Sequence, residues 1–218
     1  MKTGNTLTLA EKIISVHNMN QSRATLVAVS GIDASGKSIT TSRIYYDLTS
    51  RGYRVAVISA DKWLRHSHQK AGSTTPSSFY MNCYRWSELF NEAILPLKND
   101  RSLYLEKELQ HRESDKFYLQ VYRYTDIDII LLEGIFLFRT EFRKHYDLSV
   151  WVDCDFNTAF KRAMLRNQEQ LSLTELIRDY KTIYFPAQHL HISKDHPKEY
   201  ADVIYVNSTS RIEESISF

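Results

Sequence analysis

Residues 31–38 read GIDASGKS and fit the pattern G-x-x-x-x-G-K-[ST]. The pattern constrains the backbone strongly, because Gly31 and Gly36 let the chain turn with its N–H groups pointing inward, as a nest for phosphate oxygens. A helix that begins near Lys37 adds the positive end of its dipole at the same place. A short apolar run at 24–30, typical of a buried strand, comes directly before the loop. Strand, loop and helix in this order predict a nucleotide-binding α/β fold.

Strand-like and helix-like stretches alternate along the chain. Short apolar runs predict five strands, at residues 24–30, 54–60, 127–132, 148–153 and 203–206. Helical patterns are found at residues 1–23, 37–50, 86–97, 156–168 and 173–184. Alternation of this kind builds right-handed βαβ units. We therefore expect an α/β, P-loop NTPase-type three-layer fold, with a five-stranded parallel sheet and helices on both faces, formed by a single domain over residues 1–218.

Three stretches interrupt the alternation. Residues 101–126 are rich in charge and Tyr, and they predict a pair of outlying strands inserted into the domain. Residues 65–78 are rich in Ser, Thr and His and are expected to form a loop. Residues 155–185 are expected to form a lid and the helix that follows it.

Composition excludes several classes of protein. The chain has 28 basic and 26 acidic residues among 218, a net charge of +2, which argues against a nucleic-acid partner bound by a strongly basic face. Cys83 and Cys154 lie far apart, as expected for a reduced, cytoplasmic protein rather than a disulfide scaffold or a zinc site. No signal-peptide core and no apolar run of roughly 18 residues is present, so no membrane partner is expected.

The residues that follow the strands are the candidates for chemistry, because ligands of parallel sheets bind at the carboxyl ends of the strands. Asp61 follows the second strand, where a carboxylate can accept the proton of an attacking hydroxyl. Glu133 follows the third and, with the Ser38 hydroxyl, can hold Mg²⁺. Lys37 can reach the β- and γ-phosphates of a nucleotide. The alternative for both carboxylates is a turn or helix-cap role.

Arg162 and Arg166 are four residues apart, on one face of the helix after the fourth strand. Their guanidinium groups can close over a transferring phosphate as a lid. The alternative is a solvated basic face. Asp33, inside the loop, is expected to be a solvated turn residue rather than a catalyst.

Two further groups of residues have alternative interpretations. The paired histidines lack a metal-ligand spacing and are expected at the surface; they are His66, His68, His189 and His191. The aromatic residues around Asp61 fit either the core or a surface that stacks on a base; they are Trp63, Phe79, Tyr80 and Tyr84.

The absence of other motifs limits which class of nucleotide-binding protein this can be. An Asn-Lys-x-Asp tetrapeptide is absent and no Asp-x-x-Gly follows the second or third strand, so a Ras-like GTPase is not expected. The length leaves little room for motor or helicase machinery. A small-molecule kinase is favoured; an ATP hydrolase, a kinase of a non-nucleoside metabolite or nucleotide sugar, and a non-catalytic ATP-binding regulator are the alternatives.

Seven segments, in order along the chain, resemble the uridine kinase family of P-loop kinases, which is related to phosphoribulokinase and nicotinamide riboside kinase. The segments are VAVSGIDASGKS at 27–38, ISAD at 58–61, IILLEGIF at 129–136, YDLSVWVD at 146–153, KRAMLRN at 161–167, YFPAQ at 184–188 and YADVI at 200–204. The resemblance implies ATP and Mg²⁺ as cofactors and a small, nucleoside-like hydroxyl acceptor. It implies that Asp61 is the catalytic carboxylate and that Arg162 and Arg166 are lid arginines, and relatives of this kind are often homo-oligomers.

The donor site is complete and the acceptor site departs from the family pattern. The nucleotide is expected at Gly31, Ile32, Asp33, Ala34, Ser35, Gly36, Lys37, Ser38 and Ile39. Family members that phosphorylate uridine usually carry a Tyr-Asp segment before the third strand, and residues 103–112 show no clear equivalent. The sequence QEQLS at 168–172 replaces the usual Arg- and Gly-containing end of the lid. Uridine is therefore one candidate acceptor among several.

Overall fold

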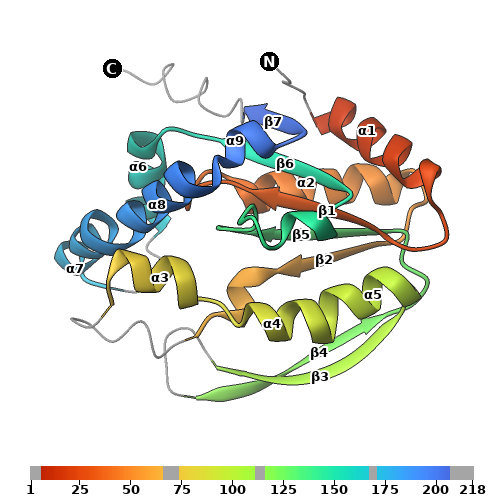
Figure 1. The fold of residues 1–218 in the computed structure, drawn as a ribbon, viewed down its shortest axis with the longest axis horizontal. Helices are drawn as coiled ribbons and strands as arrows, with labels where there is room; N and C mark the ends of the chain where they lie inside the picture. Colours follow the sequence, from red (N-terminus) through yellow and green to blue (C-terminus); the bar gives the residue numbers. More distant parts are fainter. Residues whose placement is uncertain (1–5, 66–73, 111–115, 167–170, 207–218) are drawn as a thin grey trace.

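A computed structural model describes residues 6–65, 74–110, 116–166 and 171–206. A five-stranded parallel sheet forms its centre, in the spatial order β2-β5-β1-β6-β7 (Figure 1). The strands are β1 (Thr25–Ser30), β2 (Val55–Ser59), β5 (Ile129–Gly134), β6 (Leu148–Asp153) and β7 (Val203–Val206). The predicted α/β three-layer fold is confirmed.

Two apolar layers cover the faces of the sheet. All six residues of β1 are buried, because β5 and β6 pair with it on either side and helices cover both faces. Val27 and Val29 face the layer formed with α1 (Thr6–Met19) and α2 (Lys37–Ser50). Leu26 and Ala28 alternate with them and pack into the layer on the other face. A run of apolar residues without polar alternation therefore marks a central strand.

The second layer contains a long helical stretch that continues past a proline. It comprises α4 (Trp86–Glu88), the π-helical segment η3 (Leu89–Ile94) and α5 (Leu95–Asp100). The stretch runs past residue 97, the predicted end of this helix, to Asp100. Pro96 lies in the first turn of α5, directly after η3, so the missing N–H and the proline ring fall where the hydrogen bonding changes from π-helical to α-helical.

The carboxyl-terminal helices also contain a π-helical segment followed by a proline. After α6 (Phe156–Arg166), the chain forms α7 (Leu173–Asp179), the π-helical segment η5 (Tyr180–Tyr184) and α8 (Phe185–Asp195), with Pro186 in the first turn of α8. Helical structure therefore extends well beyond the predicted end at 184. The short helix α9 (Pro197–Tyr200) leads into β7.

An antiparallel hairpin lies outside the main sheet, as residues 101–126 predicted. Its strands are β3 (Leu103–Gln110) and β4 (Phe117–Tyr124), and β3 contacts α5 (Figure 1). The expectation of a loop over 65–78 is wrong at its end, because α3 (Pro76–Asn82) starts there. The Thr75 side chain accepts a hydrogen bond from the N–H of Ser78 at 3.1 Å, which caps this helix. Residues 66–73, with His66 and His68, lie outside the described residues.

A buried polar cluster joins α3 to α8. The Tyr80 hydroxyl and the His191 ring both contact Asp195 Oδ2, and the Nδ1 atom of His191 lies 2.8 Å from it. We expected His191 at the surface, but only 3% of it is exposed, because its neighbours are the rings of Tyr80, Phe136 and Trp151. Burial lowers the pKa of His191, and the hydrogen bond to Asp195 opposes this.

None of the helices in the described part of the chain is long and apolar enough to cross a membrane.

The His191 cluster predicts how stability depends on pH. Because the pKa of His191 is lower in the folded protein, the unfolded chain binds more protons as the pH falls below about 6.5, and folding loses stability. His191→Asn removes this titration and keeps an amide that can donate to Asp195. We expect a smaller loss of unfolding free energy between pH 7.5 and 5 in the variant, measured by urea denaturation. Equal losses in both proteins would contradict the assignment. The other groups near His191 are the same in both proteins: Asp195 and Tyr80 within the cluster, and Arg139, Arg143 and Lys194 around it.

Candidate active site

The loop between β1 and α2 is held tightly against the sheet. A Cβ atom at Gly31 would lie 2.6 Å from the Val152 carbonyl oxygen and 2.7 Å from Ser35 Oγ, so only glycine fits there. Gly36 has a φ of 97°, in the left-handed region that favours glycine. The shape of the loop therefore explains why glycine occupies both positions of the motif.

Lys37 is a buried cation that folds back over this loop. Its Nζ atom donates to the Ile32 carbonyl at 2.8 Å, and 8% of the residue is exposed. Burial lowers the pKa of Lys37, and the negative charges of Asp33, Asp61 and Glu133 oppose this. A phosphate group in the loop would add further negative charge beside the ammonium group, so the site favours an anion.

Ser38 and Glu133 meet at the edge of the loop. The Ser38 hydroxyl donates to Glu133 Oε1 at 3.3 Å. Glu133 Oε2 is buried and has no hydrogen-bond partner within the described residues. Burial raises the pKa of Glu133, and the hydrogen bond from Ser38 opposes this. A divalent cation would satisfy such a carboxylate, and oxygen donors of these two types suit Mg²⁺.

Asp61 lies in the 3₁₀-helix η1 (Ala60–Trp63), directly after β2, and is exposed. The Tyr84 hydroxyl donates to its Oδ1 atom at 2.5 Å. Burial raises the pKa of Tyr84 well above its usual value, so the phenol keeps its proton and remains a donor. The carboxylate is therefore held in one orientation at the carboxyl end of the sheet.

The aromatic residues around Asp61 belong to the core. Trp63, Phe79, Tyr80 and Tyr84 are all buried. Of the two roles open for them, core packing is the one the structure shows, and Tyr84 also anchors Asp61.

The two candidate lid arginines contact groups at the phosphate loop and β6. Arg162 Nη1 lies 3.7 Å from Sγ of Cys154, just after β6, and Arg166 Nη2 lies 3.4 Å from Oδ1 of Asp33. Both arginines thus have a contact partner, and Arg166 remains exposed. Most of residues 168–172, the altered end of the predicted lid, lie outside the described residues.

Asp33 is not the solvated turn residue that we expected. Its carboxylate accepts a hydrogen bond from the Tyr180 hydroxyl, and its N–H donates to Gln188 Oε1 at 2.8 Å. Sequence reasoning missed both partners. The segment YFPAQ at 184–188, which carries part of the family resemblance, contains Gln188 and was the available signal, whereas nothing in the sequence pointed to Tyr180.

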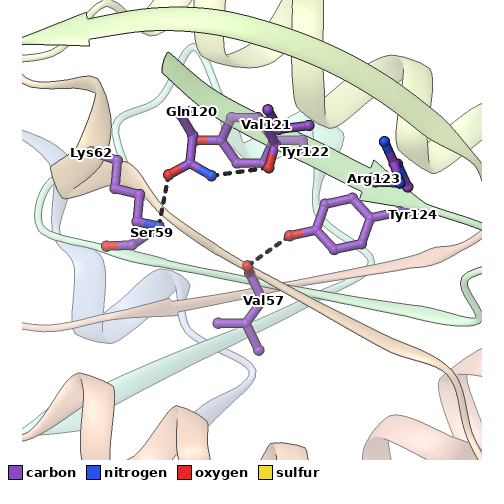
Figure 2. A pocket seen from close by; sticks show the side chains of 8 residues that line it. All are labelled: Val57, Ser59, Lys62, Gln120, Val121, Tyr122, Arg123 and Tyr124. Atoms are coloured by element: carbon purple, nitrogen blue, oxygen red, sulfur yellow. Dashed lines mark hydrogen bonds between the residues drawn. The ribbon is translucent and has the colours of Figure 1, made fainter. Parts of the chain in front are cut away.

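Two cavities flank the open edge of β2 and share Val57 and Tyr124. One has a volume of about 420 Å³ and borders Ser38 and Glu133. The other has a volume of about 360 Å³ and lies between β2 and β4. Figure 2 shows the second cavity, where the Tyr124 hydroxyl donates to the Val57 carbonyl and Lys62 donates to Gln120. The hairpin is thus fastened to the strand that leads to Asp61.

No metal cluster of His, Cys, Asp and Glu is built into the described part of the chain. His189 is exposed, as expected, and stacks on Phe156.

The parallel sheet and the glycine-lined loop with its buried lysine define a P-loop nucleotide-binding fold. A family model described as methylmalonyl Co-A mutase-associated GTPase MeaB matches residues 3–76, the third of the chain that contains the loop.

Relatives that match most of the chain are kinases. A uridine kinase of Macrococcus caseolyticus is 26% identical over 189 residues, which cover 84% of this chain and 88% of the relative. Uridine-cytidine kinase B of Dictyostelium discoideum is 28% identical over 184 residues, which cover 82% and 73%. The resemblance to the uridine kinase family of P-loop kinases is therefore confirmed, and the matches support a kinase-type phosphotransferase.

Solved structures agree on the fold. A protein described as a possible uridine kinase from Bacillus stearothermophilus superposes with a TM-score of 0.67 at 20% identity, over 91% of this chain and 99% of that one. A D-glycerate 3-kinase from Cryptococcus neoformans superposes with a TM-score of 0.58 at 10% identity, over 87% and 90%. The fold therefore also occurs in a kinase named for an acceptor that is not a nucleoside.

The close approach at Gly31 predicts a defect in Gly31→Ala. The added methyl group meets backbone and a buried side chain, so we expect a loss of about 1–3 kcal/mol in the free energy of unfolding and a disturbed phosphate loop. Urea denaturation and binding of a fluorescent ATP analogue measure the two effects.

Gly52→Ala is the control for this prediction. Gly52 has a φ of +89° with nothing within 4 Å of the added Cβ, so the variant loses about 1–2 kcal/mol through backbone strain alone. It should bind the nucleotide normally. If Gly31→Ala also binds it normally, the loop is not the nucleotide site.

Proposed function

We propose that the protein transfers the γ-phosphoryl group of ATP to a hydroxyl group of a small molecule, with a nucleoside as the first candidate acceptor. The observation on which this depends is the grouping of Lys37, Asp61 and the Ser38–Glu133 pair around one phosphate loop. The uridine kinase relatives support the same reaction class.

The donor phosphates would bind to the loop. Backbone N–H groups and the start of α2 favour negative charge there, and Lys37 would leave the Ile32 carbonyl to contact the phosphate oxygens. Ser38 and Glu133 would hold Mg²⁺, which neutralises phosphate charge when it is bound. Arg162 and Arg166 would add positive charge from α6 as the phosphoryl group moves.

Asp61 would act on the acceptor. The acceptor oxygen forms a bond to the γ-phosphorus, the bond from that phosphorus to the bridging oxygen breaks, and ADP leaves with the bonding electrons. The hydroxyl proton passes to the Asp61 carboxylate. Tyr84 fixes Oδ1 of that carboxylate, which limits how the acceptor hydroxyl can approach.

An acceptor screen tests the proposal. The protein is mixed with radiolabelled MgATP or MgGTP and, in separate reactions, with nucleosides, sugars and hydroxy acids, and labelled product is measured. We expect acceptor-dependent product with wild type and none with Lys37→Ala. Release of inorganic phosphate alone would indicate a hydrolase. Nucleotide binding without turnover would indicate a regulator, and either result would contradict the proposal.

The Asp61 assignment predicts a selective defect. Asp61→Asn keeps the shape of the side chain but cannot accept the proton, so we expect turnover to fall by roughly 10²–10⁴-fold while the dissociation constant for MgATP changes little. Asp126→Asn, which alters an exposed carboxylate paired with Arg54, is the matched control and should leave turnover unchanged. A defect confined to MgATP binding would show that Asp61 is not the base.

The metal assignment predicts a shifted magnesium requirement. Ser38→Ala removes one oxygen ligand and Glu133→Gln removes the negative charge of the other, so we expect the Mg²⁺ concentration at half-maximal rate to rise by at least the roughly 10–100-fold that loss of a group supporting a metal ligand causes. Turnover measured against Mg²⁺ concentration tests this, with the exposed Glu199→Gln as the control. An unchanged requirement in both variants would exclude these residues as ligands.

A further inference from the structure

Asp33 places a carboxylate inside a loop that is proposed to bind phosphates. A carboxylate and a phosphate repel each other, so the negative charge at this position weakens nucleotide binding unless it has another effect. Its surroundings indicate what that effect is.

Hydrogen bonds hold both the backbone and the carboxylate of Asp33 in place. Its own N–H donates to Gln188 on α8, its Oδ1 atom accepts the N–H of Ala34 at 2.8 Å, and its Oδ2 atom accepts the Tyr180 hydroxyl. The contacts come from the loop itself, from η5 and from α8. The carboxylate is therefore set in one direction by groups far apart in the sequence.

Oδ1 of this oriented carboxylate faces the last residue of α6. Arg166 Nη2 lies 3.4 Å from it, and the side chains are 38% exposed for Arg166 and 23% for Asp33. An ion pair this exposed contributes little to folding stability. Stability alone therefore does not account for the arrangement.

The guanidinium group lies in the same electrostatic environment as the buried lysine. Both Asp33 and Arg166 affect the pKa of Lys37, in opposite directions. An arginine side chain carries about 2 kcal/mol of rotamer entropy when it is free. A contact to Asp33 restricts that freedom beside the loop, before any phosphate arrives.

We propose that Asp33 is a positioning residue that holds Arg166 at the phosphoryl-transfer site, an inference that rests on the proposed kinase function. Arg166 is the group that stabilises the transferring phosphoryl charge, and Asp33 acts through it. Arginine has five N–H donors in one plane, so contact with Asp33 through Nη2 is compatible with a second contact to a phosphate oxygen. Tyr180 keeps the carboxylate aimed at Arg166.

A binding cycle with an analogue of the transferring group tests this without knowledge of the acceptor. The probes are MgADP alone and MgADP with aluminium fluoride, and dissociation constants are measured for wild type, Asp33→Asn, Arg166→Gln and the double variant. We expect Asp33→Asn to weaken the fluoride complex about tenfold and MgADP less than twofold. In the Arg166→Gln background, Asp33→Asn should cause no further loss of the fluoride complex.

Two more variants complete the design. Tyr180→Phe keeps the charge of Asp33 and removes one of its anchors, so we expect a smaller loss in the same direction. Asp47→Asn, which breaks the Asp47–Arg51 ion pair on α2, is the matched control and should bind both probes like wild type. Melting temperatures show that each variant is folded.

The other outcomes contradict the inference. Tighter binding in Asp33→Asn would show that the carboxylate only repels phosphate, and an equal loss in both backgrounds would show that Asp33 acts independently of Arg166. If wild type phosphorylates an acceptor and Asp33→Asn binds MgADP with aluminium fluoride as tightly as wild type does, the role of Asp33 alone is overturned. A wild type that neither binds the probes nor transfers phosphate would instead overturn the kinase function.

Discussion

The buried ammonium group of Lys37 is the interaction around which the site is arranged. The Lys37 side chain is buried and donates to the Ile32 carbonyl. The negative charges of Asp33, Asp61 and Glu133 oppose the effect of burial on its pKa. A charge this deep in a protein needs compensation. The negative charges of the three carboxylates provide this compensation. They come from three chain segments: the loop, the end of β2 and the end of β5.

The parallel sheet brings these three segments together. Its strands end at one edge, so residues more than seventy positions apart in the sequence, such as Asp61 and Glu133, are brought to the same place. The helices after β6 complete the site from the other side, where α6, η5 and α8 each contribute a side chain to Asp33. The hairpin is fastened to β2 through Tyr124 and Lys62, outside this arrangement.

The sequence predicted the sheet well because local patterns determine it. Continuous apolar runs mark strands that are covered on both faces, and the motif at 31–38 marks the loop. The errors about Asp33 and His191 have a common cause, because the surroundings of both residues come from parts of the chain that are distant in sequence. Asp33 looks solvated until Tyr180 and Gln188 are known, and His191 looks exposed until α3 packs against α8. The hydrogen bond from Tyr180 to Asp33 joins residues 147 positions apart and leaves no local pattern. His191 and Asp195 are four residues apart on α8, a spacing that the sequence analysis did not use.

A crystal structure with Mg²⁺ and a non-hydrolysable ATP analogue tests most directly whether this loop is a phosphate site. We predict that the β- and γ-phosphates lie in the loop at 31–38 and that the Lys37 ammonium group has moved from the Ile32 carbonyl to their oxygens. A loop without phosphate at saturating analogue, with Lys37 still bonded to Ile32, would contradict it.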